Sequence, residues 1–105
     1  MAFDLMVGKG SKVKDSPDIV GSIEFDELPS LSRLIKRLDS GFLHRVSNLF
    51  EDQVFSVADV TGALDELLPL LTQSLEADER AMLHKLIAVL AFAQARRQNL
   101  HGIAD

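Results

Sequence analysis

A chain of 105 residues has room for one hydrophobic core, and we expect residues 1–105 to form a single domain. Hydrophobic residues make up 47% of the chain and charged residues 26%, and the net charge is −5. This composition is that of a globular protein and excludes a disordered one. The absence of Cys excludes disulfides, thiolate catalysis and zinc sites with Cys ligands.

The chain carries no pattern for a membrane span or for secretion. Its longest apolar run, residues 86–93, is much shorter than the roughly 20 residues needed to cross a bilayer. The first residues lack the basic-then-apolar order of a secretory signal. Together with the missing Cys, these features predict a cytoplasmic protein without a membrane helix.

The first quarter of the chain predicts two strands. Residues 3–7 are mostly apolar and stop at a glycine, which favours a short strand, and residues 8–17 have the composition of a loop. Alternation in residues 19–25 predicts a second strand, with Ile23 and Phe25 facing inward.

Three helical segments are expected next. Pro29 opens an amphipathic helix that ends at Gly41, and apolar spacing in residues 42–50 predicts a second, short helix. Residues 54–57 fit a brief extended piece, a loop or the start of a helix equally well. A third helix follows a cap near Ser56 and should be kinked or broken at Pro69.

The last predicted helix runs from about Glu76 to Asn99, where His101-Gly102 would terminate it. Its central turns are apolar on nearly all sides, so we expect a largely buried helix that is central to the core or forms half of an oligomer interface. One face carries small residues at steps of three and four, with one histidine. This seam consists of Ala77, Ala81, His84, Ala88, Ala91 and Ala95.

The predicted fold is α+β and mainly helical. A short N-terminal β element of two or three strands would pack on about four helices, with the long C-terminal helix at the centre. An all-α bundle is the alternative.

Negative charge is concentrated between Val46 and Glu79, where eight acidic residues occur without any Lys or Arg. Such a segment is either a solvated face or a docking surface. It would repel a phosphate backbone and attract a basic protein, so we expect no nucleic-acid partner. The candidate contact residues are Glu51, Asp52, Asp59, Asp65, Glu66, Asp78 and Glu79.

Motifs for catalysis or cofactor binding are not recognisable. The run Gly8-Lys9-Gly10-Ser11-Lys12 lacks the glycine spacing of a phosphate-binding loop, and no two histidines have the helical spacing of a metal pair. Neighbouring carboxylates on a helix point about 100° apart and do not form an acid–base pair. We therefore expect no catalytic residue, no metal ligand and no cofactor.

Three stretches resemble the small acidic proteins of bacterial toxin–immunity loci. They are Phe3-Asp4-Leu5-Met6-Val7-Gly8, Gly62-Ala63-Leu64-Asp65-Glu66-Leu67-Leu68, and the ending from Leu83-His84-Lys85-Leu86-Ile87-Ala88 to His101-Gly102-Ile103-Ala104-Asp105. The resemblance implies tight, inhibitory binding to a cognate toxin through an acidic surface that faces a basic cleft.

Three functional hypotheses follow. The first is a non-enzymatic protein-binding domain of the immunity type, with a basic toxin domain as its partner. The second is an oligomeric structural or regulatory module, such as a homodimer, that pairs through the seam. The third, and least favoured, is an enzyme that uses His84 with a carboxylate in hydrogen-bond reach.

Overall fold

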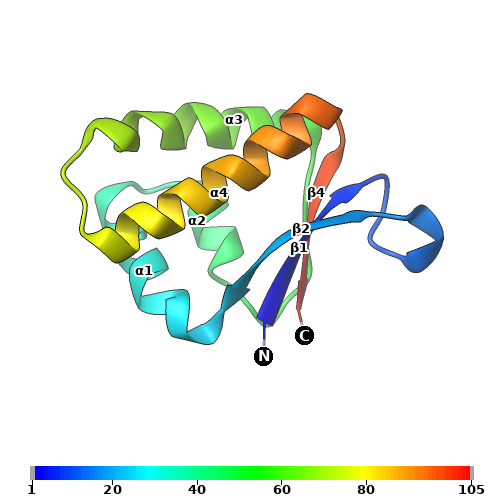
Figure 1. Ribbon diagram of the computed structural model, residues 1–105, viewed down its shortest axis with the longest axis horizontal. Helices are drawn as coiled ribbons and strands as arrows, with labels where there is room; N and C mark the ends of the chain where they lie inside the picture. The colour runs from blue at the N-terminus through cyan, green and yellow to red at the C-terminus, as the bar shows by residue number, and fades with distance from the viewer. Residues whose placement is uncertain (1, 105) are drawn as a thin grey trace.

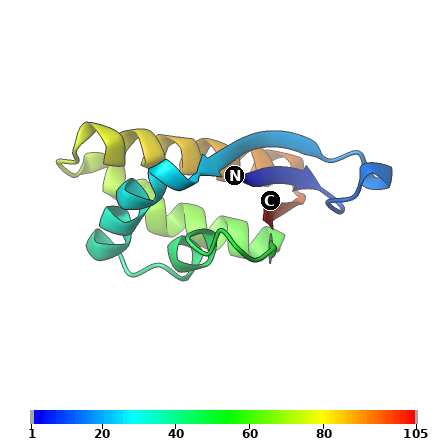
Figure 2. The same cartoon turned by 90° about the horizontal axis from the view of Figure 1, so that it is seen from below.

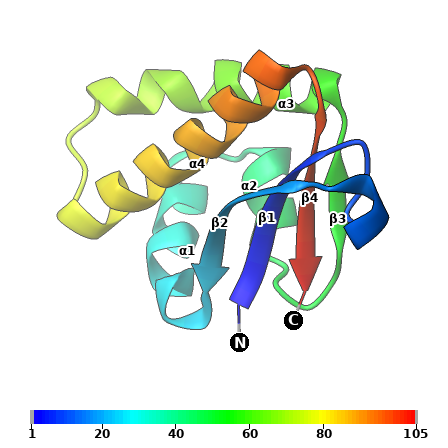
Figure 3. The same ribbon diagram turned by 45° about the vertical axis from the view of Figure 1, so that its right-hand side comes forward.

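The computed structural model describes residues 2–104 and arranges them as one four-stranded sheet with four α-helices on one side (Figures 1 and 3). The strands are β1 (Ala2–Gly8), β2 (Asp18–Glu24), β3 (Gln53–Phe55) and β4 (Asn99–Ala104). Their order in the sheet is β2-β1-β4-β3, and every neighbouring pair is antiparallel. The start of β1 and the end of β4 therefore lie side by side (Figure 2).

One face of the sheet forms the floor of the core. Because side chains alternate between the two faces of a strand, the inward positions recur at every second residue. These positions hold large apolar side chains that are at most 1% exposed, namely Phe3, Leu5, Val7, Ile23, Phe55 and Leu100.

The helices are α1 (Leu28–Arg37), α2 (Gly41–Val46), α3 (Val57–Leu67) and α4 (Ala77–Arg96). Each begins at a recognisable local signal. Pro29 lies in the first turn of α1, and capping boxes begin α3 and α4, where the backbone N–H groups of a first turn need acceptors. Their inward faces complete the core with buried residues that include Leu34, Leu43, Val60, Leu67, Leu83, Leu86 and Leu90.

Three short 3-10 turns connect these elements. They are η1 (Val13–Asp15), η2 (Phe25–Glu27) and η3 (Leu68–Thr72). The last one confirms the break predicted at Pro69, since α3 ends two residues before this proline. Among residues 2–104, no helix has the length and apolar character to cross a membrane.

The predicted fold class is wrong in its β part. The sheet is not a short N-terminal element of two or three strands, because β3 comes from the middle of the chain and β4 from its end. The all-α alternative is wrong for the same reason. The strands predicted at residues 3–7 and 19–25 are present as β1 and β2, although β2 ends at Glu24 and Phe25 begins η2. The ambiguous piece at 54–57 overlaps β3.

The prediction for the last helix is wrong in two respects. Arg97 adopts a left-handed conformation (φ 53°) that ends α4 at Arg96, and His101-Gly102 lie inside β4 instead of closing the helix. The helix is also buried along only one face, because the seam residues all point to solvent. Its core face consists of Glu79, Met82, Leu83, Leu86, Val89, Leu90 and Ala93.

Gly102 is required where β4 pairs with β1. A Cβ atom at this position would overlap the ring of Phe3, which is fully buried. We expect Gly102→Ala to lower the free energy of unfolding by about 1–3 kcal/mol, the cost of overpacking a core. Gly21→Ala is the matched control, because its Cβ would be 3.4 Å from Val89 and in ordinary contact. If urea denaturation showed the same loss of unfolding free energy for Gly102→Ala and Gly21→Ala, this account would be contradicted.

Candidate functional site

The acidic segment, residues 46–79, is not an acid-only surface in the folded protein. Basic residues from the first 45 positions fold back onto it and pair with several of its carboxylates. Arg33 and Arg37 of α1 reach the start of α4, and Arg45 of α2 reaches the start of α3. These pairs separate the predicted contact residues into a paired and an unpaired group.

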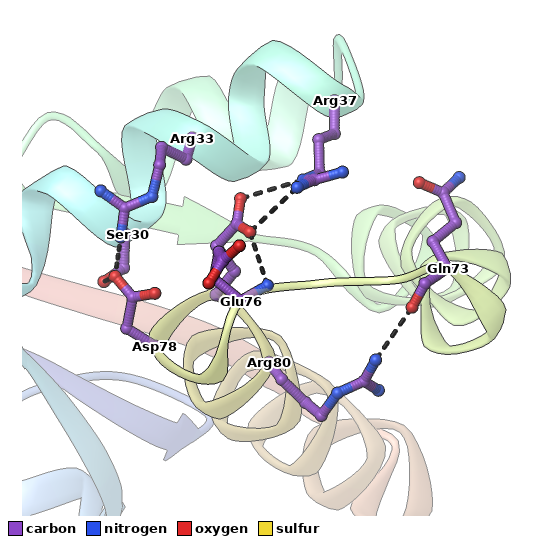
Figure 4. A network of polar contacts seen from close by, with 8 residues as sticks. Ser30, Arg33, Arg37, Gln73, Glu76, Asp78 and Arg80 are labelled. Atoms are coloured by element: carbon purple, nitrogen blue, oxygen red, sulfur yellow. Dashed lines mark hydrogen bonds and ion pairs between the residues drawn. The ribbon is translucent and has the colours of Figure 1, made fainter.

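The first paired group lies where α1 packs on α4 (Figure 4). Arg37 donates to both carboxylate oxygens of Glu79, at 2.9 and 3.0 Å, and the backbone N–H of Glu76 donates to the same group at 2.9 Å. Asp78 accepts from Ser30 at 2.9 Å and forms an ion pair with Arg33. Glu79 is 1% exposed, so it belongs to the core and not to a docking surface.

These contacts shift the protonation of Glu79. The Arg37 guanidinium holds the pKa of Glu79 below its ordinary value of 4.5, and the Glu76 N–H acts in the same direction. Both partners favour the charged carboxylate. Glu79 therefore has a structural role as a capping and pairing residue.

Asp59 is also engaged. It accepts a hydrogen bond from the Ser56 N–H at 3.0 Å, and Arg45 lies 3.7 Å from its carboxylate. The hydrogen bond from Ser56 is the main cause that lowers the pKa of Asp59. Asp52 accepts from the backbone N–H of Ala104 at 2.8 Å, next to the end of β4.

Glu51, Asp65 and Glu66 form the unpaired group. All three are exposed, and within residues 2–104 none of their carboxylates has a hydrogen bond or an ion pair. Asp65 and Glu66 follow each other near the end of α3. They are the predicted contact residues that remain free to bind a partner.

Glu66 borders a cleft between α2, α3 and β3. The cleft has a volume of about 290 Å³, and its lining combines apolar and polar surface in similar amounts. Two glycines keep it wide, because a Cβ atom at Gly41 or Gly62 would meet no atom within 4 Å. The lining residues of this α2–α3 cleft are Gly41, Phe42, Arg45, Phe55, Ala58, Asp59, Gly62, Ala63 and Glu66.

Arg45 is the charged residue of the cleft that the sequence did not indicate. Its guanidinium lies over the ring of Phe55, 4.2 Å from the centroid, and donates to the carbonyl oxygen of Val54 at 2.6 Å and to Gln53 at 3.3 Å. Such a stacked and hydrogen-bonded guanidinium is fixed in place. The only signal in the sequence is its position as the last basic residue before the acidic segment.

The seam on α4 lies away from this cleft. Ala77, Ala81, Ala88, Ala91 and Ala95 are all exposed, as is His84. The seam therefore makes no close helix contact within residues 2–104.

The histidines give little support to a catalytic site. Within residues 2–104, the ring of His84 makes no hydrogen bond, so the carboxylate partner that the enzyme hypothesis needs does not lie beside it. His44 pairs with Asp39 at 2.7 Å, but both side chains are exposed. The described residues also contain no group of three or more His, Cys, Asp or Glu that could hold a metal ion.

The lowered pKa of Glu79 predicts acid sensitivity. A carboxylate with a lower pKa in the folded state stabilises the fold above its unfolded pKa, and this contribution is lost as the pH falls through the folded value. We expect the free energy of unfolding to fall between about pH 5 and about pH 3, and less steeply in Glu79→Gln. Urea denaturation across this range measures both slopes. Glu66→Gln, which removes an unpaired carboxylate, should keep the full slope, and equal slopes for the two variants would contradict the assignment.

Gly62 weakens α3 without any packing reason in this chain. It lies in the helix interior, where Gly is less favourable than Ala by about 0.5–1 kcal/mol, and its Cβ would enter open space. We expect Gly62→Ala to raise the free energy of unfolding by about this amount, as measured by thermal or urea denaturation. Ala58→Gly, one turn earlier, should lower it. A destabilised Gly62→Ala protein would show that the cleft is narrower than described.

Comparisons of the chain with protein-family models, with characterised proteins and with solved structures give no match. The resemblance to toxin–immunity proteins therefore stays a prediction. The case for a function rests on the geometry of the α2–α3 cleft.

Proposed function

We propose that this chain is a non-enzymatic protein-binding domain whose α2–α3 cleft receives a basic side chain of its partner. The observation that carries the proposal is the unpaired Glu66 at the border of an open cleft with both apolar and polar lining, with the unpaired Asp65 beside it in the sequence. Free carboxylates next to apolar surface suit an arginine or lysine, which combines an aliphatic stem with a charged end.

The charge balance of the cleft supports a cationic ligand. Its lining contains two carboxylates, Asp59 and Glu66, and one guanidinium, that of Arg45. Arg45 is already held by Phe55, Val54 and Asp59, so Glu66 has no cation of its own. An incoming guanidinium would pair with Glu66 while its aliphatic stem contacts apolar lining residues such as Phe42 and Ala63.

The expected partner is a basic protein domain. Residues 46–79 contain no Lys or Arg, and Glu51, Asp65 and Glu66 carry their unpaired charge to the surface. The net charge of −5 and these three unpaired carboxylates give a negative field that speeds the encounter with a basic surface. The resemblance described above makes a cytoplasmic inhibitor of a basic toxin the specific form of this proposal.

An oligomeric module that pairs through the seam is the second candidate. The exposure of all six seam residues favours it, because small side chains on a helix face allow close approach of another helix. It differs from the first candidate in its surface, since the seam residues do not line the α2–α3 cleft.

A short basic peptide tests the first candidate directly. We expect the capped tripeptide Gly-Arg-Gly, titrated into isotope-labelled protein, to shift the backbone NMR signals of Gly41, Gly62 and Glu66. Glu66→Gln should weaken this binding by about fivefold, the size of one partly exposed ionic hydrogen bond. Gly62→Leu should abolish it, because the leucine side chain would occupy the cleft.

Two controls make the result specific. Glu51→Gln removes another unpaired carboxylate that does not line the cleft, and it should leave the affinity unchanged. The tripeptide Gly-Leu-Gly carries no charge and should bind more weakly. Shifts that spread over all acidic residues, or a Glu66→Gln protein that binds like the unmodified one, would refute the proposal.

A further inference from the structure

A recess with a basic lining lies where α4 ends and β4 begins. The end of β1 borders it, because Gly8 pairs with Asn99 across the sheet (Figure 1). Its volume of about 430 Å³ is within the range of pockets that bind small molecules. The lining residues, which define the basic recess, are Gly8, Lys9, Arg96, Arg97, Gln98 and Asn99.

Every side chain that lines the basic recess beyond Gly8 can donate hydrogen bonds to an anion. Lys9, Arg96 and Arg97 carry positive charge, and the carboxamides of Gln98 and Asn99 each offer an NH₂ group. Within residues 2–104, the lining includes no carboxylate and no large apolar side chain. The recess is therefore a positive site on a chain whose net charge is −5, and its field attracts anions.

Most of these donors have no partner in the folded chain. Among the described residues 2–104, the side chains of Lys9, Arg97, Gln98 and Asn99 make no hydrogen bond and no ion pair. Gln98 and Asn99 are also half-buried, and a carboxamide that loses water without gaining a partner costs free energy. A bound anion would satisfy these groups.

The backbone holds Arg97 in place at a cost. This residue has a φ of 53°, in the left-handed region where glycine is favoured. Its N–H and that of Gln98 donate to the carbonyl oxygens of Gln94 and Ala93, at 3.1 and 3.2 Å, and so close the end of α4. A glycine would make the same bonds with less strain, so the turn does not explain the arginine. Strained residues of this kind gather at functional sites.

Other contacts fix the walls of the basic recess. The ring of His101 donates to the carbonyl oxygen of Gly8 at 3.1 Å, and both residues are buried. Arg96 lies 3.4 Å from the carboxylate of Asp18 and stacks over the ring of Phe92, 4.7 Å from its centroid. A site that is held in this way loses little conformational entropy when a ligand binds.

A second recess adjoins the first and differs in its charge. It has a volume of about 390 Å³ and shares Gly8, Lys9, Arg96 and Gln98 with the basic recess. Its remaining polar side chains are those of Lys14, Asp15, Ser16 and Asp18. Carboxylates accept hydrogen bonds from hydroxyl groups but repel a further negative charge. The adjoining recess therefore suits a neutral, hydroxylated group.

We propose that the basic recess binds the phosphate group of a small phosphate monoester, whose hydroxylated organic part occupies the adjoining recess. A phosphate monoester carries a charge of about −1.5 to −2 and three acceptor oxygens, which match three cations better than a singly charged carboxylate does. The guanidinium of Arg97 has the planar fork that pairs with two of these oxygens. Lys9 adds a point charge from the end of β1, and no glycine-rich nucleotide-binding loop is needed.

An NMR titration of isotope-labelled protein at constant ionic strength tests the site. We expect inorganic phosphate and glycerol phosphate to shift the backbone signals of Gly8, Lys9, Arg97 and Asn99, with dissociation constants between about 0.1 and about 1 mM. Glycerol phosphate should bind about two- to fivefold more tightly than inorganic phosphate, because its hydroxyl groups add hydrogen bonds. Acetate should bind at least about fivefold more weakly, because it carries a single charge.

Two variants remove the proposed contacts. Arg97→Gly should weaken phosphate binding by about five- to tenfold, and Lys9→Gln by about fivefold. Arg97→Gly should also raise the midpoint of urea denaturation, because glycine adopts the left-handed conformation without strain. Its loss of binding therefore cannot come from a loss of the fold. Lys12→Gln is the matched control, since this unpaired lysine of the same loop lines neither recess, and it should leave the affinity unchanged.

Three outcomes would overturn the proposal. The first is equal binding of phosphate and acetate, and the second is a Lys12→Gln protein that binds phosphate as weakly as the Arg97→Gly protein does. Either would mean that this surface collects anions without a defined site. The third is a single-stranded DNA oligonucleotide that binds more tightly than glycerol phosphate, which would identify an extended polyanion as the ligand.

The place of the organic part is tested separately. Glycerol phosphate that binds no more tightly than inorganic phosphate would overturn the role of the adjoining recess. None of these outcomes affects the peptide titration of the α2–α3 cleft, because that cleft shares no residue with either recess.

Discussion

The insertion of β4 between β1 and β3 is the constraint on which the rest of the structure depends. The ring of Phe3 lies against Gly102 at the centre of this arrangement, where no side chain larger than hydrogen fits. Through β4, the N-terminal hairpin is joined to β3, which leads directly into α3. The α2–α3 cleft depends on the same strand, because Phe55 of β3 pairs with Leu100 and supports the guanidinium of Arg45.

Local signals in the sequence were sufficient for the presence of the helices and of the first two strands, but not for where every helix ends. Helical spacing of apolar residues and capping residues indicate where α1, α3 and α4 begin, and alternation indicates β1 and β2. They were not sufficient for β4. Its inward positions include Gly102, which lacks a side chain, so alternation is weak. What makes these residues a strand is the distant β1, and no local pattern reports such pairing.

The candidate site shows the same division between local and distant information. The sequence correctly indicates a stretch without basic residues, but it cannot tell which of its carboxylates stay free. Arg37 and Arg45 neutralise Glu79 and Asp59 only because α1 and α2 fold back onto the later helices. Glu66 and Gly62 line the same cleft only in the folded chain, and no sequence pattern indicates that Glu66 is unpaired or that Gly62 faces open space.

The position of β4 also has a consequence for how the protein folds. Phe3 pairs with Ala104 across nearly the whole described chain, so the central strand pairing closes a very long loop and carries a large entropic cost. Until β4 docks, β1 has an unpaired edge and β3 has no neighbour. Bare strand edges recruit other chains. This chain is therefore most prone to aggregate before β4 docks. A chaperone that shields β1 would help most at that stage.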